Sequence, residues 1–361
     1  MTVILAIETS CDECAAALVR ADKTILSSTL HSQLETHEQY GGVVPELAAR
    51  AHLAHIQNIV ATAMHQAGCG YGDLAAVAAT IGPGLIGGVL VGANFAKAIA
   101  LARNLPFIGV NHLEGHALTC RLTDEVEFPF LLLLVSGGHT QILAVLGVGQ
   151  YRQLGTTRDD ALGESFDKVA KMLGLGYPGG PALEKAAKSG DDRQFDLPRP
   201  MVGRRMTDAG ECDFSFSGLK TAVRRQIEKW TINADTNSFS QQDQSDMAAS
   251  FQRAASDCVV DRLRQAMIFF RQNYGGKTAA PPCLVVAGGV AANQVLRRDL
   301  SELAAEMGYR SVAPPLALCT DNAAMIGWAA MERYLLGQRD DLTIPTRPRW
   351  PLDPTANGEA A

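Results

Sequence analysis

The 361-residue sequence has no excess of positive charge and no long apolar segment. Its 32 lysines and arginines are outnumbered by 38 aspartates and glutamates, which argues against binding nucleic acid through bulk positive charge. An RNA partner would need a local basic patch or a helper subunit. No apolar run reaches the roughly 18 residues of a membrane span, and the first residues lack the basic segment of a signal peptide. The sequence therefore predicts a cytoplasmic protein that does not bind a membrane.

The eight cysteines indicate reduced thiols, because disulfides are rare in proteins without an export signal. Cys11 and Cys14 have the C-x-x-C spacing of a redox motif. A redox motif of the thioredoxin type opens a helix, whereas the apolar residues after Cys14 resemble a strand. We therefore interpret the pair as two small residues that flank a turn.

Hydrophobic residues make up 47% of the chain and charged residues 19%, which excludes a largely disordered protein. Apolar runs at residues 3–7 and 15–19, separated by a polar turn, predict two neighbouring strands. The same plan recurs at 130–135 and 141–146, where a Gly-Gly pair in the turn signals a hairpin. The two plans begin about 127 residues apart. We interpret them as corresponding parts of two similar lobes.

Strands and helices alternate along the chain, which predicts an α/β fold. Further strands are expected at 77–81, 107–110 and 284–287, and helices at 46–66, 291–307 and 322–336. In the helix after Gly84, Gly88 and Gly92 are four residues apart, a spacing of small residues that allows close packing.

The predicted elements also suggest boundaries. We expect an N-terminal lobe of residues 1–127, completed by a helix at 322–337, and a C-terminal lobe of residues 128–321. A more polar insertion is expected at about 150–240, and an extended, partly mobile tail at 338–361.

His112 and His116 could share a metal ion, because positions i and i+4 lie on one face of a helix. The spacing resembles that of zinc peptidases, but Leu113 stands where their motif has a glutamate, so the general base is missing. Asp321, at the start of a predicted helix, is the best candidate for a third ligand. Such a set leaves coordination positions open and suits iron, zinc or manganese. The alternative is two histidines that only cap or line a helix.

Several glycine-rich segments are similar to nucleotide-binding motifs. Residues 82–87 match G-x-G-x-x-G, but no carboxylate follows at the distance that a dinucleotide site requires. Residues 276–278 mimic the end of a P-loop whose first glycine is missing, and the chain has no G-x-S-x-G elbow. Turns at 8–13, 136–139 and 288–289 each follow an apolar strand and could place backbone N–H groups on phosphate oxygens. This pattern predicts a nucleotide in a cleft between two lobes.

Six motifs in order resemble those of the universal family of tRNA threonylcarbamoyltransferase catalytic subunits, formerly described as O-sialoglycoprotein endopeptidases. They are IETSCD at 7–12, GPGL at 82–85, NHLEGH at 111–116, LVSGGHT at 134–140, FSFSGLKT at 214–221 and GGVAAN at 288–293. The resemblance runs from residue 3 to about 337, and no motif position departs from the family pattern.

The resemblance implies an actin/Hsp70-like ATPase fold of two duplicated lobes with a nucleotide in the interlobe cleft. It implies transfer of the threonylcarbamoyl group of threonylcarbamoyl-adenylate to N6 of the adenosine just 3′ of the anticodon (position 37), in tRNAs that read codons beginning with A, with release of AMP. It further implies one iron ion, or zinc, on His112, His116 and Asp321. The implied adenylate-binding residues are Leu134, Val135, Ser136, Gly137, Gly138, Asp167, Gly180 and Asn293.

The resemblance also implies partners, namely a catalytically silent paralogue that forms a heterodimer with this subunit, a small P-loop ATPase, and a separate synthase that makes the donor. The acceptor is an aromatic amine and a weak nucleophile, so the enzyme must polarise or orient the donor carbonyl and remove a proton. We expect Asp12 or His139 to take this proton, since they lie in the first and second phosphate turns. The alternative role of each is to orient a turn or the metal.

The tRNA anticodon arm needs a local basic surface on a chain of negative net charge. We expect a basic face formed by Lys220, Arg224, Arg225 and Lys229, together with Arg204 and Arg205. The alternative is an ordinary solvated helix face. Two other functions remain open: a metallo-endopeptidase, which the missing glutamate at Leu113 disfavours, and a non-catalytic nucleotide-binding partner, which the intact ligand set disfavours.

Overall fold

The computed structural model describes residues 2–38, 40, 42–206, 211–232, 240–275 and 281–357. The segment similar to a P-loop, at 276–278, lies outside the described residues. The chain divides into two compact units. The first unit comprises Met1–Glu127, Leu146–Tyr151 and Pro314–Ala361, and the second comprises Phe128–Val145 and Arg152–Ala313.

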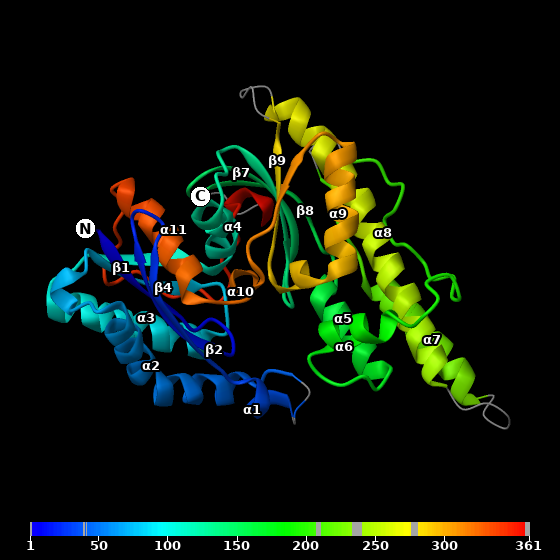
Figure 1. The fold of residues 1–361 in the computed structure, drawn as a ribbon, viewed down its shortest axis with the longest axis horizontal. Coiled ribbons are helices and arrows are strands. Elements are labelled where there is room, and N and C mark those ends of the chain that lie inside the picture. Colours follow the sequence, from blue (N-terminus) through cyan, green and yellow to red (C-terminus); the bar gives the residue numbers. More distant parts are fainter. Residues whose placement is uncertain are drawn as a thin grey trace. The chain divides into compact units, whose positions relative to one another are not determined.

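Each unit contains a five-stranded sheet, and the two sheets have the same strand order. Figure 1 labels β1, β2 and β4 of the first sheet and β7, β8 and β9 of the second. The first has the order β3-β2-β1-β4-β5 and the second the order β8-β7-β6-β9-β10. β1 pairs antiparallel with β2 and parallel with β4, and β6 likewise pairs antiparallel with β7 and parallel with β9. The repeat predicted from the two apolar runs is thus a duplicated sheet.

The strands predicted from apolar runs are present, and β3, β8 and β10 are further strands that the sequence analysis did not predict. Those of the first sheet are β1 Val3–Glu8, β2 Glu13–Arg20, β3 Ile25–Ser32, β4 Ala76–Gly82 and β5 Phe107–Asn111. Those of the second are β6 Phe130–Val135, β7 Thr140–Gly147, β8 Gln150–Thr156, β9 Cys283–Ala287 and β10 Arg310–Val312. β6 is apolar throughout, and β1 is apolar up to its last residue, Glu8. Both patterns arise because both faces of each strand are buried.

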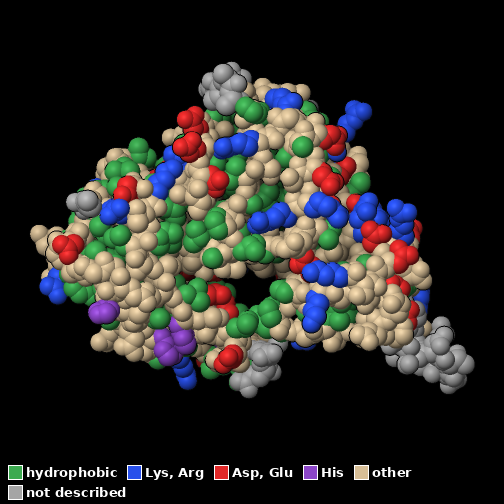
Figure 2. Space-filling view, in the orientation of Figure 1, with side chains coloured by type: hydrophobic (Ala, Val, Ile, Leu, Met, Phe, Trp, Pro, Cys, Tyr) green, Lys and Arg blue, Asp and Glu red, His purple; other side chains and the backbone are tan. Residues whose placement is uncertain are grey.

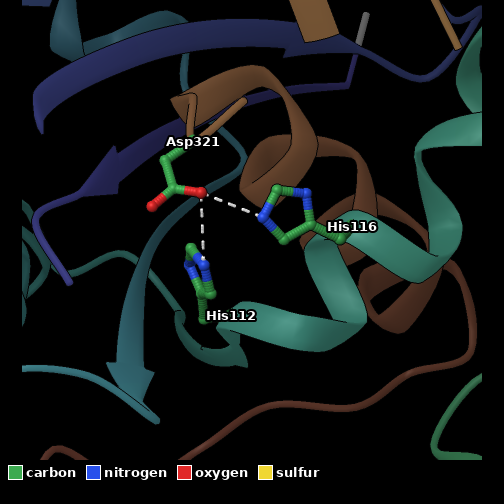
Figure 3. Close-up of side chains that lie close together, drawn as sticks. All are labelled: His112, His116 and Asp321. Carbon is green, nitrogen blue, oxygen red and sulfur yellow. Dashed lines mark hydrogen bonds and ion pairs between the residues drawn. The ribbon is translucent and has the colours of Figure 1, made fainter. Parts of the chain in front are cut away.

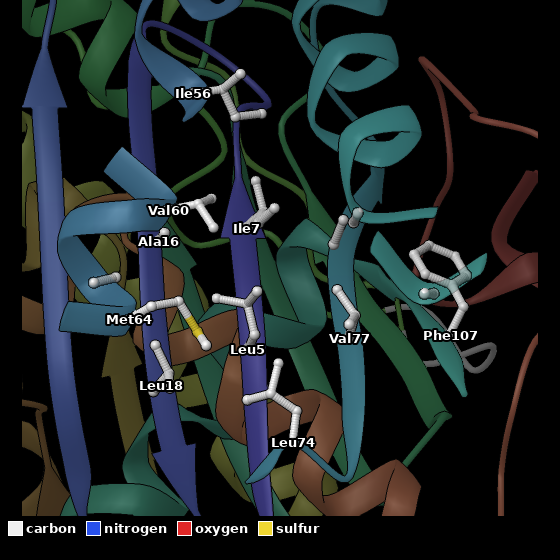
Figure 4. Close-up of a cluster of buried hydrophobic side chains, with 14 of the residues drawn as sticks. Leu5, Ile7, Ala16, Leu18, Ile56, Val60, Met64, Leu74, Val77 and Phe107 are labelled. Carbon is white, nitrogen blue, oxygen red and sulfur yellow. The ribbon is translucent and has the colours of Figure 1, made fainter. Parts of the chain in front are cut away.

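Helices cover both faces of the first sheet. They are α1 Leu34–Glu38, α2 Pro45–Ala67, α3 Ile86–Arg103, α4 His112–Thr123, α10 Leu316–Cys319 and α11 Ala323–Leu335, with 3₁₀ turns at Tyr71–Asp73 and Pro354–Asn357. Leu5 and Ile7 of β1 pack in one cluster with Ile56 and Val60 of α2 (Figure 4). Ala6 points to the other face, where α11 approaches so closely that a Cβ on Gly327 would lie 3.3 Å from its methyl group.

The second unit is richer in helix than its sequence pattern suggests. Its helices are α5 Leu162–Met172, α6 Gly179–Ala187, α7 Ser217–Ile232, α8 Gln241–Asn273 and α9 Gln294–Glu306, with a 3₁₀ turn at Gly289–Ala292. The polar segment expected as an insertion at 150–240 contains β8, α5, α6 and α7 in its described part. The sequence analysis did not identify α8, although it has 33 residues and buries apolar side chains along its length.

The C-terminal part of the chain lies on the first unit. The predicted lobe boundary after residue 321 differs from the division seen here, at Pro314, because α10 already packs with the first unit. The described part of the tail, residues 338–357, is extended, as predicted, but it is packed against the protein. Leu342, Ile344 and Trp350 pack against the core of the first unit.

One described helix, α3, is long and apolar enough to cross a membrane, with a hydropathy of 1.3 over its 18 residues. It contains Lys97 and Arg103, so it is not an uninterrupted apolar run. α3 packs against β4 and α2 within the first unit. Since core helices of soluble proteins have the same length and composition, this single helix is weak evidence for a membrane span.

Candidate functional site

Three predicted metal ligands converge in the first unit (Figure 3). His112 and His116 lie one turn apart on α4, and Asp321 lies between α10 and α11. Oδ1 of Asp321 is 3.0 Å from Nε2 of His116 and 3.4 Å from Nε2 of His112. One ligand atom from each residue lies within 4.8 Å of the others. The structure therefore brings together the His112, His116 and Asp321 set.

Local sequence explains why the two helices present these side chains. Asn111 ends β5 and caps α4, because its Oδ1 accepts a hydrogen bond from the N–H of Leu113. Asn322 caps α11 in the same way and fixes the residue before it, Asp321. Gly115 lets α4 approach α11, since a Cβ there would lie 2.8 Å from Cδ1 of Ile326. Two caps and one glycine thus place the three ligands.

The other side of His112 is held by residues from the end of β1. Nδ1 of His112 lies 3.1 Å from Oε2 of Glu8 and 3.0 Å from Oγ of Ser10. Glu8 is fully buried and also accepts a hydrogen bond from the hydroxyl of Thr80. The sequence analysis missed Glu8 as a site residue, although an acidic residue at the end of a wholly apolar strand was a signal for it.

The charges of this site favour a cation. Burial alone would lower the pKa of His112, but Asp321 and Glu8 together raise that pKa well above its usual 6.5. Burial alone would raise the pKa of both carboxyl groups, yet the adjacent imidazole lowers the pKa of Glu8 and of Asp321. Without a metal, the site therefore stabilises a positive charge on His112, between two carboxylates.

The donor set fits a transition metal. Nδ1 of His116 is buried and has no hydrogen-bond partner, while its Nε2 points at Asp321. The Asp321 side chain is 24% exposed, whereas that of His116 is 2% exposed, so solvent reaches the set from the side of the carboxylate. Two imidazoles and one carboxylate are ligands that iron and zinc both accept with positions left open for substrate.

The turn between β1 and β2 brings more acidic groups close to this set. Glu13, the first residue of β2, has its pKa raised to about 9 by burial and by the charges of Asp321 and Asp12. Asp12, a predicted catalytic residue, is buried in the same turn and hydrogen-bonded to Glu13. The sequence analysis did not single out Glu13, because its unusual environment arises from groups distant in sequence.

The C-x-x-C pair is not arranged for redox chemistry. Both cysteines are free, and Cys14 lies within β2 with no exposed surface. Burial raises the pKa of both thiols, that of Cys14 to about 12, so neither is an activated thiolate. The interpretation as small residues around a turn is confirmed.

The glycines of α3 pack both against helix α2, where a Cβ on Gly88 would lie 3.2 Å from the ring of His52, and against the turn after β1. A Cβ on Gly88 would lie 2.4 Å from the carbonyl oxygen of Thr9, and one on Gly92 would lie 2.1 Å from its Oγ1. The hydroxyl of Thr9 donates to the carbonyl of Gly88 over 2.9 Å. The close packing predicted from the spacing thus fixes the first candidate phosphate turn.

The second candidate turn, residues 136–139, lies at the carboxyl end of β6 in the second unit. The N–H of Ser136 donates to the carbonyl of His139 over 2.8 Å, and the N–H of His139 donates to Oγ of Ser136. Gly163 of α5 touches this turn, since a Cβ there would lie 2.6 Å from the carbonyl oxygen of Ser136. Gly288, after β9, has a φ of +93° and abuts the carbonyl of Val135.

β6 and β9 are parallel, so their turns meet at one edge of the sheet. α/β proteins bind ligands outside this carboxyl edge. In the first unit, β1, β4 and β5 are also parallel neighbours, and Glu8, Ser10 and His112 lie at or just after the ends of β1 and β5. Both units therefore place their candidate residues at equivalent edges.

The predicted adenylate-binding residues lie in the second unit but differ in what they expose. Leu134 and Val135 have fully buried side chains, so only their backbone groups can reach a ligand. Gly137 and Gly138 are exposed.

The remaining predicted contacts are already hydrogen-bonded. Oδ1 of Asp167 accepts from the N–H of Gly179 at the start of α6, Gly180 donates to the same carboxyl group, and burial raises its pKa. Asn293 caps α9 through the N–H of Leu296, and its Nδ2 donates to Gln252. Its side chain is therefore committed to the fold.

One residue expected in the basic face, Lys220, forms an ion pair within the protein instead. Nζ of Lys220 lies 2.5 Å from Oδ2 of Asp160, so this lysine stabilises the loop before α5. Arg224 is exposed and pairs with Glu228 on the same helix, whereas Arg225 and Lys229 are exposed without such a partner one turn away among the described residues. On the face shown in Figure 2, basic and acidic side chains are interspersed.

Comparison with known proteins identifies the family. A sequence model described as tRNA N6-adenosine threonylcarbamoyltransferase (TsaD) matches residues 24–328. The chain belongs to this family. The threonylcarbamoyltransferase of Paramagnetospirillum magneticum is 58% identical over 354 residues and 98% of each chain. That of Erythrobacter litoralis is 58% identical over 357 residues, covering 99% of this chain and 97% of the relative.

A solved structure of similar fold supports the architecture alone. HypF of T. kodakarensis is 13% identical, with a TM-score of 0.61 over 93% of this chain and 48% of that one. The predicted two-lobed, actin-like ATPase fold is thus confirmed. The predicted reaction, transfer of a threonylcarbamoyl group to N6 of adenosine in tRNA, is confirmed by the family model and the named relatives. Nothing in the comparisons favours a peptidase or a non-catalytic partner.

Proposed function

We propose that this threonylcarbamoyltransferase is metal-dependent and that His112, His116 and Asp321 hold one iron or zinc ion. The observation that carries the proposal is the convergence of two imidazole Nε2 atoms on Oδ1 of Asp321, at 3.0 and 3.4 Å. When bound, the ion would supply Lewis-acid polarisation of an oxygen of the donor. Glu8 and Ser10 hold Nδ1 of His112, which leaves Nε2 directed at the ligand position.

The chain's residues must also move one proton. In the reaction, N6 of the adenosine bonds to the carbamoyl carbon, the bond from that carbon to the adenylate oxygen breaks, and AMP leaves. N6 loses a proton in this step, and we assign its removal to Asp12 or His139. Asp12 lies in the first unit beside Glu13, and His139 ends the turn after β6 in the second unit.

The second unit holds the adenylate part of the donor in this proposal. The glycines of the 136–139 turn allow phosphate oxygens to approach backbone N–H groups, because they have no side chains. Asp167 of α5 and Gly180 at the start of α6 provide polar groups for the nucleoside. Leu134 and Val135 contribute backbone atoms only, and Asn293 acts by fixing the start of α9. Placement of the nucleotide between the lobes stays a prediction.

The partners follow from the same proposal. We place the tRNA anticodon arm on the exposed basic residues of α7, with the silent paralogue, the small P-loop ATPase and the donor synthase as protein partners in the cytoplasm.

Three measurements test the proposal. Elemental analysis of protein purified without chelators should find about one iron or zinc per chain, lost in His112→Ala and His116→Ala. Mass spectrometry of tRNA nucleosides, after incubation with threonine, bicarbonate, ATP, the synthase and the partners, should show the modified adenosine.

In single-turnover transfer from preformed adenylate, Asp12→Ala or His139→Ala should slow the reaction about 10²-fold or more. Near-normal rates in both variants would refute the base assignment, and metal-free protein with full activity would refute the metal.

A further inference from the structure

We propose that residues 340–350, here the clasp segment, position the metal-binding helix α4 through Asn111. The inference rests on the proposed metal site and extends it to a part of the chain more than 200 residues away. Asn111 is 2% exposed and makes two hydrogen bonds of opposite polarity. Its Oδ1 accepts from the N–H of Leu113 over 2.9 Å, and its Nδ2 donates to the carbonyl of Trp350 over 2.9 Å.

The clasp segment is anchored along β5, which leads directly into α4. Among the described strands, β5 is the last in the order of the first sheet, so one side of its backbone pairs with no strand of that sheet. The N–H of Asp340 donates to the carbonyl of Phe107 over 3.0 Å, and its carboxylate accepts from the N–H of Gly109 over 2.8 Å. The segment therefore provides hydrogen-bond partners for backbone groups at the edge of β5, as close as two residues before Asn111.

A second set of contacts links the clasp segment to the other side of His112. The N–H of Arg347 donates to the carbonyl of Ile81 over 2.7 Å, and Pro348 accepts from the N–H of Gly84 over 3.2 Å. The next residue, Leu85, donates to the carbonyl of Ser10 over 2.8 Å. Oγ of Ser10 in turn lies 3.0 Å from Nδ1 of His112.

Gly82 shows how closely this second contact is fitted. Its φ is +142°, and a Cβ there would lie 1.9 Å from the carbonyl oxygen of Arg347. The clasp segment thus reaches His112 by two routes, through the cap of its helix and through the turn that holds its Nδ1. Since both routes start from one segment, loosening the segment should disturb the geometry of the ligand set rather than only the edge of the sheet.

The bond to Trp350 can be separated from the helix cap by one substitution. Asn111→Asp keeps an oxygen for the N–H of Leu113 but replaces the donor to Trp350 by a second oxygen, which repels that carbonyl. Asn94→Asp is the matched control, because Asn94 is exposed on α3 and bonds only within its own helix among the described contacts. Asp340→Ala is a second variant that releases the segment from β5 without touching α4 or its cap.

The test measures Zn²⁺ affinity of the full chain by competition with a chromophoric chelator, together with amide hydrogen exchange of residues 112–116. We expect Asn111→Asp to weaken Zn²⁺ binding about tenfold and to speed exchange in the first turn of α4, with Asp340→Ala acting in the same direction and Asn94→Asp unchanged. Wild-type affinity and exchange in both clasp variants would overturn the inference. If the wild-type chain binds no Zn²⁺, the proposed metal site fails, whereas the exchange result still decides whether the clasp positions α4.

Discussion

Oε2 of Glu8 lies 3.1 Å from Nδ1 of His112, on the side of the imidazole opposite to Asp321. A buried carboxylate in this place selects one ring orientation and one tautomer, and it makes the other nitrogen a better ligand. The sequences of β1 and α4 meet here because β1 and β4 are parallel neighbours, as are β4 and β5, so all three strands end at one edge.

Glu8→Gln should weaken metal binding by about tenfold to a hundredfold, because an amide keeps the shape of Glu8 but not its charge on His112. The measurement is Zn²⁺ affinity by chelator competition at fixed pH. Glu46→Gln, an exposed change on α2, is the control and should have no effect. An unchanged affinity in Glu8→Gln would show that Ser10 alone suffices to orient His112.

Metal affinity should fall as the pH is lowered, because a proton on His112 competes with the ion. The pKa of His112 in the metal-free protein is raised above 6.5 by Asp321 and Glu8, even though burial opposes this. Below that raised pKa, affinity should drop about tenfold per pH unit. Calorimetric Zn²⁺ titrations in two buffers of different ionisation heat should detect about one proton released. Binding that is independent of pH between 6 and 8 would contradict the raised pKa.

The stability of the metal-free protein should depend on pH in the opposite direction to metal affinity, falling as the pH rises. The folded state holds the His112 proton more tightly than the unfolded chain does. Its contribution to stability is therefore fully present below about pH 6.5 and is lost as the pH rises through the raised pKa. Thermal unfolding of chelator-treated protein checks this direction, since the metal should mask it.

Glu13→Gln should stabilise the metal-free protein at neutral pH. The pKa of Glu13 is raised to about 9 by burial and by Asp321 and Asp12, so folding must neutralise a group that is ionised in the unfolded chain. This cost is absent below the ordinary pKa of 4.5 and grows as the pH rises toward 9. We expect a gain of about 1–3 kcal/mol in urea unfolding at pH 7.5 and little change at pH 4.5. Equal stability changes at both pH values would show that the carboxyl group is not perturbed.

Charge reversal at Arg224 and Arg225 should weaken tRNA binding and reduce its salt dependence by about one unit of slope per lost phosphate contact. Arg193→Glu is a control, since Arg193 is 89% exposed and lies outside α7. Lys220→Met should instead lower stability and leave the salt slope unchanged, because Lys220 pairs with Asp160. Filter binding of tRNA over a range of salt concentrations separates these outcomes, and an unchanged slope in the double variant removes α7 from the interface.

Local pattern was enough to predict most strands and the helical pair of histidines. Apolar runs mark β1 and β6 because both faces of these strands are buried, and the i, i+4 spacing of His112 and His116 is a property of the helix itself. Asp321 could be proposed because it stands at the start of a predicted helix, after a strand-like run.

The surroundings of those ligands depended on contacts between distant segments. Glu8 meets His112 across 104 residues, and Asn111 meets Trp350 across 239. Periodicity and capping act over a few residues and carry no information on which strand ends share an edge or which carbonyl a buried amide reaches. The sequence by itself therefore determined the elements, the ligand types and the family resemblance. Only the tertiary structure decided which buried carboxylates and which C-terminal carbonyl complete the site, because burial and strand order set those partners.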